Sequence, residues 1–331
     1  MVQIDGDPYI RHSLRTSMFF PSTRLFVVGN PKAAGTALRW WLLAAHGVDV
    51  YARTAESWWG ESAPFQTVWD QEIDLAFTWG DLSAEQRDDA ISSTDVLTVQ
   101  PVRHPLSRLF SAWSGKYLIA EPYYTERLPE GFPTLPETID NEQQIADLFE
   151  EFVAVLHEVV SERGFLAVDV HFWPQHRLLA RPPAGDSVVL RQEAMDEGIT
   201  TIRDHLQQRG LDVGEAPRIN ETVIPYRTEL VTDQTFDLVV SMYGDDFESW
   251  QYERARPKSS SRQIDLDWLN DVRGRNARYG VLHRALIHQH TENARLQGEI
   301  VSLRDHERQL LDSTSWKVTG PLRWVSDKVK R

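Results

Sequence analysis

The chain has no cysteine, only four methionines and no apolar run as long as a membrane-spanning helix. Without cysteine it can form neither disulfides nor thiolate metal sites, and this absence favours a reducing compartment such as the cytosol. A bilayer-spanning helix needs about 18 consecutive apolar residues, so none is expected. Residues 1–13 are polar and acidic and do not resemble a signal peptide.

Basic residues are also in short supply, with 35 Lys and Arg against 49 Asp and Glu and a net charge of −14. This balance argues against general nucleic-acid binding, which requires a basic face. An anionic ligand would have to be bound by a local group of cations. The length of 331 residues allows one large domain, alone or with an appendage.

The chain is organised around residues 24–41, where an apolar run at 25–28 predicts a buried strand. A Gly-Asn-Pro turn follows, and helical spacing begins at Thr36. The first N–H groups of a helix lack internal partners and favour an anion. Lys32 adds a positive charge, and Gly35 allows close approach to the backbone. The loop is not the motif GxxxxGK[ST], and an ordinary βα turn would show a similar pattern.

A second strand is predicted at residues 96–102, directly before Arg103. The helix that follows carries Ser111. A guanidinium offers a planar pair of donors to a phosphate, and a serine hydroxyl can add another. The sequence therefore contains two phosphate-binding candidates, each at the end of a strand.

Four stretches together resemble sulfotransferases that use 3′-phosphoadenosine-5′-phosphosulfate (PAPS). PKAAGT at 31–36 is similar to their 5′-phosphosulfate loop, and VRHPLSRLFSAWSGKY at 102–117 is similar to their 3′-phosphate motif. HFWPQ at 171–175 and YGDDF at 243–247 resemble elements of the carbohydrate sulfotransferase branch. The stretches follow the family's order over residues 20–255, and they depart from it at His104, where Asp is commoner.

The resemblance implies an α/β fold with a P-loop-like parallel sheet flanked by helices, PAPS as donor and no metal. It implies that Lys32 stabilises the leaving phosphate. His171 becomes the first candidate for the base that deprotonates the acceptor hydroxyl, with Asp169 as the alternative. A structural histidine in the core is the competing interpretation. The residues implied to bind the donor are Pro31, Lys32, Ala33, Ala34, Gly35, Thr36, Ala37, Arg103 and Ser111.

The acceptor implied by the resemblance is a hydroxyl of a carbohydrate or glycolipid. Aromatic faces suit sugar rings, and the chain has 12 Trp, although core packing explains most tryptophans equally well. The competing functions are a P-loop-like kinase and a non-catalytic scaffold of the same fold. Eukaryotic members of the branch are typically anchored in the Golgi membrane. The lack of an anchor here favours a bacterial, cytoplasmic enzyme.

Domain organisation is predicted as a sulfotransferase domain at 1–255, a helical extension at 256–312 and a basic tail at 313–331. Residues 1–23 have the composition of a polar lead-in, and 256–261 that of a linker. Outside the two motifs at the strand ends, periodicity and capping residues predict further elements. These are helices at 83–92, 142–163, 193–209, 232–243 and 264–311, and a strand at 188–190.

A heptad pattern in the second half of the last helix indicates a coiled coil, with Asn293 at a core position typical of parallel dimers. The alternatives are a homodimer through this helix and a helix folded back on its own domain. The tail carries five basic residues and one acidic residue, with Trp316 and Trp324. It could form an amphipathic helix from Pro321 at the inner membrane. Docking to a partner, or disorder, would explain it equally well.

Overall fold

The computed structural model describes residues 7–48, 77–78, 82–121, 131–178, 185–216 and 224–320. The chain divides into two compact units, Met1–Gly274 and Arg275–Arg331. The domain boundary was predicted after residue 255, but residues beyond it pack within the first unit. The backbone N–H of Ser260 donates to the carbonyl of Tyr226 at 2.9 Å, and Leu269 is fully buried.

The first unit is built on a five-stranded sheet of order β3-β1-β2-β4-β5. β2, β4 and β5 are parallel, as expected from the sequence, whereas β1 pairs antiparallel with both β2 and β3. The sheet is therefore mixed, and its parallel part carries the two predicted phosphate-binding turns. The strands are β1 (Met18–Phe20), β2 (Leu25–Val27), β3 (Phe77–Thr78), β4 (Leu97–Val102) and β5 (Ser187–Arg191).

The prediction of a polar lead-in at residues 1–23 was wrong. Residues Pro8–Thr16 form helix α1, which Asp7 caps by accepting a hydrogen bond from the N–H of Tyr9 at 2.8 Å. β1 follows directly, and all three of its residues are buried. α1 is amphipathic although its composition is mainly polar, because its few apolar residues lie on one face and contact the sheet.

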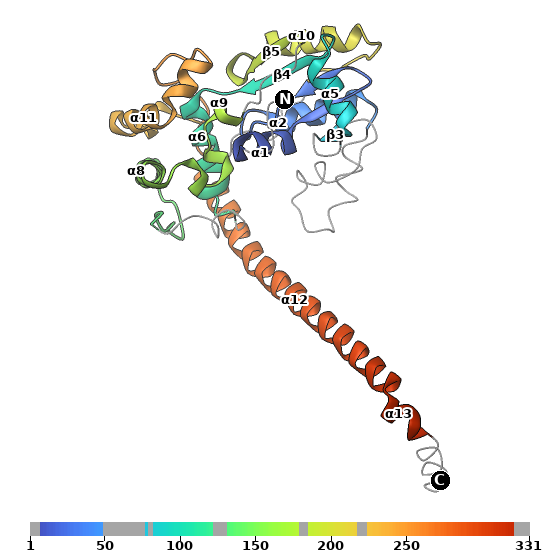
Figure 1. Cartoon of the computed structure of the whole chain (residues 1–331). Helices are drawn as coiled ribbons and strands as arrows, with labels where there is room; N and C mark the ends of the chain where they lie inside the picture. Colours follow the sequence, from blue (N-terminus) through green and yellow to red (C-terminus); the bar gives the residue numbers. More distant parts are fainter. Residues whose placement is uncertain are drawn as a thin grey trace. The chain divides into compact units, whose positions relative to one another are not determined.

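Helices cover both faces of the sheet, because each strand alternates its side chains between them. Leu25 and Val27 of β2 pack on one face with α2 (Gly35–Ala45) and α10 (Met195–Gln207). Phe26 packs on the other face with α1 and with the helix α5 (Ala84–Ser92). The expected α/β arrangement of a sheet flanked by helices is confirmed, and Figure 1 shows α10 beside β5 and β4.

A second apolar cluster joins α6 (Pro105–Ala112), α8 (Glu142–Arg163) and α11 (Asp233–Ser249). Its centre is aromatic, with Phe110, Trp113 and Phe149 in mutual ring contact. The chain continues from α6 into a π-helix, Trp113–Leu118. These helices lie together in Figure 1. This cluster fixes α6, and with it the turn that follows β4.

Most predicted helices are confirmed within one or two residues. α8 matches its prediction at both ends, with Gly164 as C-cap at φ 75°. α5 begins with the predicted capping box, in which the Ser83 hydroxyl accepts from the N–H of Gln86. α11 starts after Thr232 as expected, but it continues past Tyr243 to Ser249 through a kink at Tyr243. The kink and the last turn bring Asp246 into the core.

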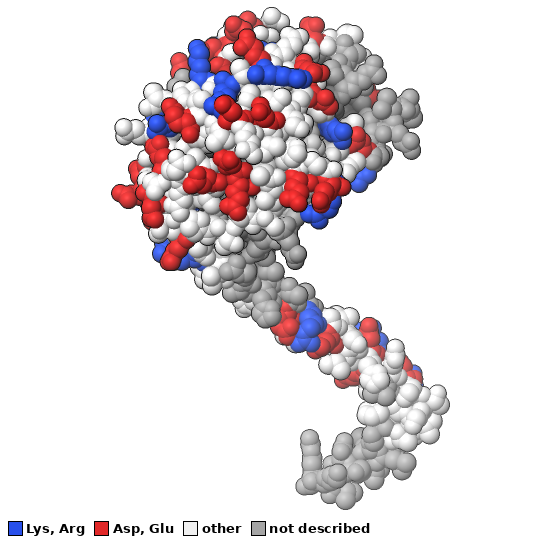
Figure 2. Space-filling model, turned by 90° about the vertical axis from the view of Figure 1, so that its left-hand side faces the viewer, with Lys and Arg blue, Asp and Glu red and all other residues white. Residues whose placement is uncertain are grey.

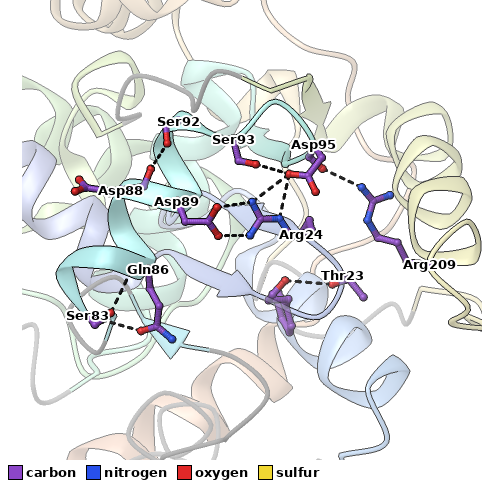
Figure 3. Close-up of polar contacts among 11 residues, drawn as sticks. Thr23, Arg24, Ser83, Gln86, Asp88, Asp89, Ser92, Ser93, Asp95 and Arg209 are labelled. Atoms are coloured by element: carbon purple, nitrogen blue, oxygen red, sulfur yellow. Dashed lines mark hydrogen bonds and ion pairs between the residues drawn. The ribbon is translucent and has the colours of Figure 1, made fainter.

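Arg24 ties the start of the parallel strands to the helices beside them (Figure 3). Its guanidinium donates to Asp95, which precedes β4, at 3.1 Å, and forms an ion pair with Asp89 of α5. Arg209, just after α10, donates to the carbonyl of Asp95 at 2.9 Å. These contacts stand at the end of β2 and β4 opposite the predicted site, so they set strand register without entering the chemistry.

The second unit contains most of α12 (Leu266–Asp312) and the short helix α13 (Thr314–Val318). The long helix predicted at residues 264–311 is confirmed, since α12 covers Leu266–Asp312. The predicted segment from Pro321 onward lies outside the described residues. Within the described part of the chain, no helix combines the length and the apolar character required to span a bilayer.

Candidate functional site

The predicted phosphosulfate loop connects β2 to α2 and has an unusual backbone. Lys32 and Ala34 both have left-handed conformations, with φ of 66° and 61°. Such conformations cost non-glycine residues about 1 kcal/mol or more, so the surroundings must enforce them. Ala34, at the N-cap of α2, provides no side-chain hydrogen bond to the helix. The dipole of α2 therefore points its positive end at this loop without a capping side chain.

Because Gly29 has no side chain, the end of α1 packs directly against the backbone at the start of this loop. A Cβ atom at Gly29 would lie 2.1 Å from the Thr16 hydroxyl and 2.6 Å from the Thr16 carbonyl carbon. The N–H of Gly29 donates to the Ser17 hydroxyl at 2.9 Å, and its carbonyl accepts from Ser13 at 3.1 Å. Any side chain at this position would push α1 away from the loop.

Gln175, in the HFWPQ element, holds the ends of β2 and β4 together. Its amide oxygen accepts from the N–H of Arg103 at 2.9 Å and from the side chain of Asn30 at 3.1 Å. Its amide nitrogen donates to the carbonyl of Arg103 at 2.7 Å. Asn30 also donates to the carbonyl of Pro101 in β4 at 2.8 Å. The two predicted turns are thus joined by one buried amide.

Asp246 and Arg108 complete this framework. The Asp246 carboxylate accepts from the backbone N–H groups of Gln175 and His176, each at 2.8 Å. The Arg108 guanidinium donates to the carbonyl of Pro31 at 2.9 Å and to that of Trp173 at 2.6 Å. All four sequence stretches that carry the family resemblance therefore meet in one hydrogen-bonded framework.

Replacing Asp246 with alanine should lower the free energy of unfolding by about 2–6 kcal/mol, since each buried N–H group that loses its acceptor costs about 1–3 kcal/mol. Two buried N–H groups at the start of α9 (Gln175–Leu178) would lose their acceptor. Denaturant unfolding followed by tryptophan fluorescence measures the change. The neighbour Asp245, 76 % exposed in its side chain, is the matched control. Asp245→Ala should change stability by under about 0.5 kcal/mol, and an equal loss in both variants would contradict the assignment.

Lys32 lies among other cations. Its pKa is lowered to about 7, chiefly by burial and then by neighbouring positive charges. The guanidinium of Arg103 donates to the carbonyl of Lys32 at 3.5 Å. A group of cations held together in this way favours an anion between them. The neighbouring charges belong to Lys116, Arg103 and Arg108.

His171 and Asp169 form a hydrogen-bonded pair at the same site. Nδ1 of His171 lies 2.6 Å from a carboxylate oxygen of Asp169. Burial lowers the pKa of His171 to about 4, with Asp169 opposing the shift and the charges of Lys116 and Lys32 adding to it. The ring is therefore neutral at pH 7. In the tautomer that carries its proton on Nδ1, the ring donates to Asp169 and the acceptor nitrogen is Nε2, the arrangement that a general base requires.

A cavity of about 940 Å³ is lined in part by Arg103, whereas Lys32 is not among its lining residues. His104 and Ser107 line it with Arg103, and His104 Nε2 lies 2.9 Å from the carbonyl of Ala255. The predicted linker at 256–261 forms part of its wall. Ser111 is buried on α6 and does not line this cavity. The basic residues of the lining are Arg103, Arg191, Arg256, Lys258 and Arg262, against the two acidic residues Glu193 and Glu253. Arg256 also forms an ion pair with Asp233.

One face of the molecule is mainly acidic. Figure 2 shows Asp and Glu side chains spread over it, with fewer Lys and Arg among them. The whole chain carries a net charge of −14. Long-range attraction therefore does not favour an anionic ligand, and the cations of the loop and the cavity must supply its binding energy.

The structure brings together Lys32, Arg103 and His171, three of the residues that the sequence analysis selected. The framework residues Asn30, Gln175 and Asp246 had no predicted role, although the last two lie inside the motifs HFWPQ and YGDDF. The basic residues at 256–262 were also not predicted as part of a site. Three basic residues within seven positions were the available signal for them.

The comparison with known families identifies one match. The family described as "Sulfotransferase family" matches residues 17–253, more than two thirds of the chain. No match was found among curated proteins or among solved structures. The matched region begins at the residue before β1 and ends after α11, so it contains the sheet, both turns and the whole hydrogen-bonded framework.

Proposed function

Since the chain belongs to the sulfotransferase family, we propose that it moves a sulfuryl group from PAPS to a hydroxyl of a carbohydrate or glycolipid. The observation that carries this proposal is the junction of the turns after β2 and β4. The Arg103 guanidinium reaches the backbone of Lys32, and Gln175 bonds to both turns. Two anion-binding turns fixed side by side suit a ligand with a charged group at each end.

The residues present fit this donor. The uncapped N-terminus of α2 and Lys32 suit the 5′-phosphosulfate end. Arg103 and the basic wall of the adjoining cavity suit a phosphate at the other end, and a cavity of about 940 Å³ accommodates a nucleoside. When bound, PAPS supplies an activated sulfuryl group whose transfer leaves adenosine 3′,5′-bisphosphate.

The protein's residues then have distinct roles. Lys32 places a positive charge where negative charge develops on the leaving phosphate. His171, oriented by Asp169, takes the proton from the acceptor hydroxyl at Nε2. Arg108 and Gln175 hold the two turns in position and need no contact with the reacting atoms. The carbohydrate class of acceptor is supported by the resemblance of HFWPQ and YGDDF to the carbohydrate branch.

Adenosine 3′,5′-bisphosphate should stabilise the protein against heat without magnesium. At a ligand concentration a hundredfold above Kd, binding contributes about 2.7 kcal/mol, which raises Tm by several degrees in a domain of this size. Adenosine 5′-monophosphate, which lacks the 3′-phosphate, should stabilise far less. Differential scanning fluorimetry measures both. Stabilisation by magnesium-ATP alone would instead favour the kinase interpretation.

The acceptor is tested separately. Donor carrying a radioactive sulfuryl group is incubated with glycan and glycolipid extracts, and the labelled products are separated and identified. Label on a sugar hydroxyl supports the proposal. Label found only on a non-carbohydrate hydroxyl would agree with sulfuryl transfer as the reaction. It would overturn the proposal that the acceptor is a carbohydrate or glycolipid.

A further inference from the structure

Helix α12 has two parts with different surroundings. Its first turns pack on the first unit, where Leu269 is buried and Asn270 bonds to the backbone of Ile139 in both directions, at 2.8 and 2.9 Å. Arg273 donates to the carbonyl of Pro136. The rest, from Arg275 to Asp312, belongs to the second unit. Helices in proteins gain most of their stability from packing an apolar face, so a contact surface is expected here too.

That surface is visible as a stripe of exposed apolar side chains. Leu296, Ile300 and Leu303 are exposed by 42, 48 and 68 %, at the spacing of successive turns on one helix face. Leu282, two heptads before Leu296, is 63 % exposed. A repeat of seven residues is that of a left-handed coiled-coil seam. Its polar members here include Gln289, between Leu282 and Leu296, and Glu307, one heptad after Ile300.

We propose that residues 275–312 form a parallel, two-stranded coiled coil with a second copy of this chain. The heptad frame places Ile300 at position a and Leu296 and Leu303 at position d. Asn293, also exposed, falls at position a one heptad before Ile300. In a parallel, in-register pair the two Asn293 amides meet each other, which specifies two strands and one register. In an antiparallel pair each would face an apolar d position.

The charges beside the seam agree with this pairing. Glu299 at position g faces Arg304 at position e of the second helix in a parallel dimer, so opposite charges meet. The pair one heptad earlier, Glu292 with Gln297, brings no like charges together. Within each helix Glu299 also pairs with Arg295 on the outer side. Exposed pairs of this kind contribute little stability, but they select the orientation.

The adjacent residues Ile300 and Val301 provide a matched test on the full chain. Both are exposed and β-branched, but only Ile300 lies in the seam. Sedimentation equilibrium should give about twice the chain mass of 38.1 kDa for the wild type and for Val301→Glu. Ile300→Glu should give the mass of one chain, with the melting temperature of the first unit unchanged. A wild-type monomer, as a folded-back helix would give, overturns the proposal, and so does equal behaviour of the two variants.

The lack of cysteine allows a direct test of orientation. Asn293→Cys should form a covalent dimer under mild oxidation, because parallel helices bring the two position-a residues together. Gly298→Cys, at the outward position f, should remain monomeric on a non-reducing gel. Efficient cross-linking of Gly298→Cys, or none of Asn293→Cys, would overturn the parallel register.

Discussion

Replacing Lys32 with alanine should lower kcat by about 10²- to 10³-fold, the usual effect of removing one group that stabilises developing negative charge. The loop would keep its backbone, since Arg103 bonds to the carbonyl of Lys32 and Arg108 to that of Pro31. The side chain, in contrast, is a desolvated cation among other cations. Its removal should leave the melting temperature unchanged or slightly higher.

Initial rates with saturating donor and a thermal melt test this prediction together. Lys317→Ala is the matched control, because Lys317 is 61 % exposed in its side chain and lies on α13, outside the first unit. Lys32→Arg should recover only part of the rate, since a guanidinium differs in shape from an ammonium. Near-normal turnover in Lys32→Ala would refute the assigned role. A large fall in melting temperature would show that Lys32 is structural.

Replacing His171 with alanine should cost about 10²- to 10⁴-fold in kcat/KM, the range for a general base. The wild-type pH profile should be a bell. His171, with a pKa of about 4, must be neutral to accept a proton, so activity is lost as pH falls through that value. Lys32, with a pKa of about 7, must be charged, so activity of the free enzyme is lost as pH rises through it.

The acidic fall in activity is assigned to His171 and the basic fall to Lys32, so replacing one of these residues should abolish only the fall assigned to it. His171→Ala should lose the acidic limb and retain the basic one, and Asp169→Asn should reduce the rate by leaving the Nδ1 proton without its carboxylate. His306→Ala, on the exposed surface of α12, is the control and should match the wild type. An acidic limb that persists in His171→Ala would assign the base to another group.

Local signals predicted much of the fold. α8 was correct at both ends because its apolar period and its terminal Asn141 and Gly164 all lie within the helix or beside it. β1 and α1 were missed because their burial depends on neighbours further along the chain. The backbone conformations that make Lys32 and Ala34 unusual are equally invisible in the sequence, since neither residue type signals a positive φ.

The candidate site was predictable at those residues whose side-chain charge alone indicates a ligand. A lysine and an arginine at two strand ends indicate an anion, and the structure brings these two together. The framework was not predictable in this way, because a buried amide or carboxylate acquires its role from its partners. Asn30 and Gln175 are 145 positions apart, and Gln175 and Asp246 are 71 apart. No local pattern encodes such pairings.

The spread of this framework along the chain has a consequence for synthesis. The loop at residues 30–36 leaves the ribosome early, but its support through Gln175 depends on Asp246, near the end of the first unit. A nascent chain therefore cannot complete this framework until residue 246 has emerged. Fragments that end before Asp246 are expected to lack the hydrogen bonds that fix Gln175, and with them the support of the loop.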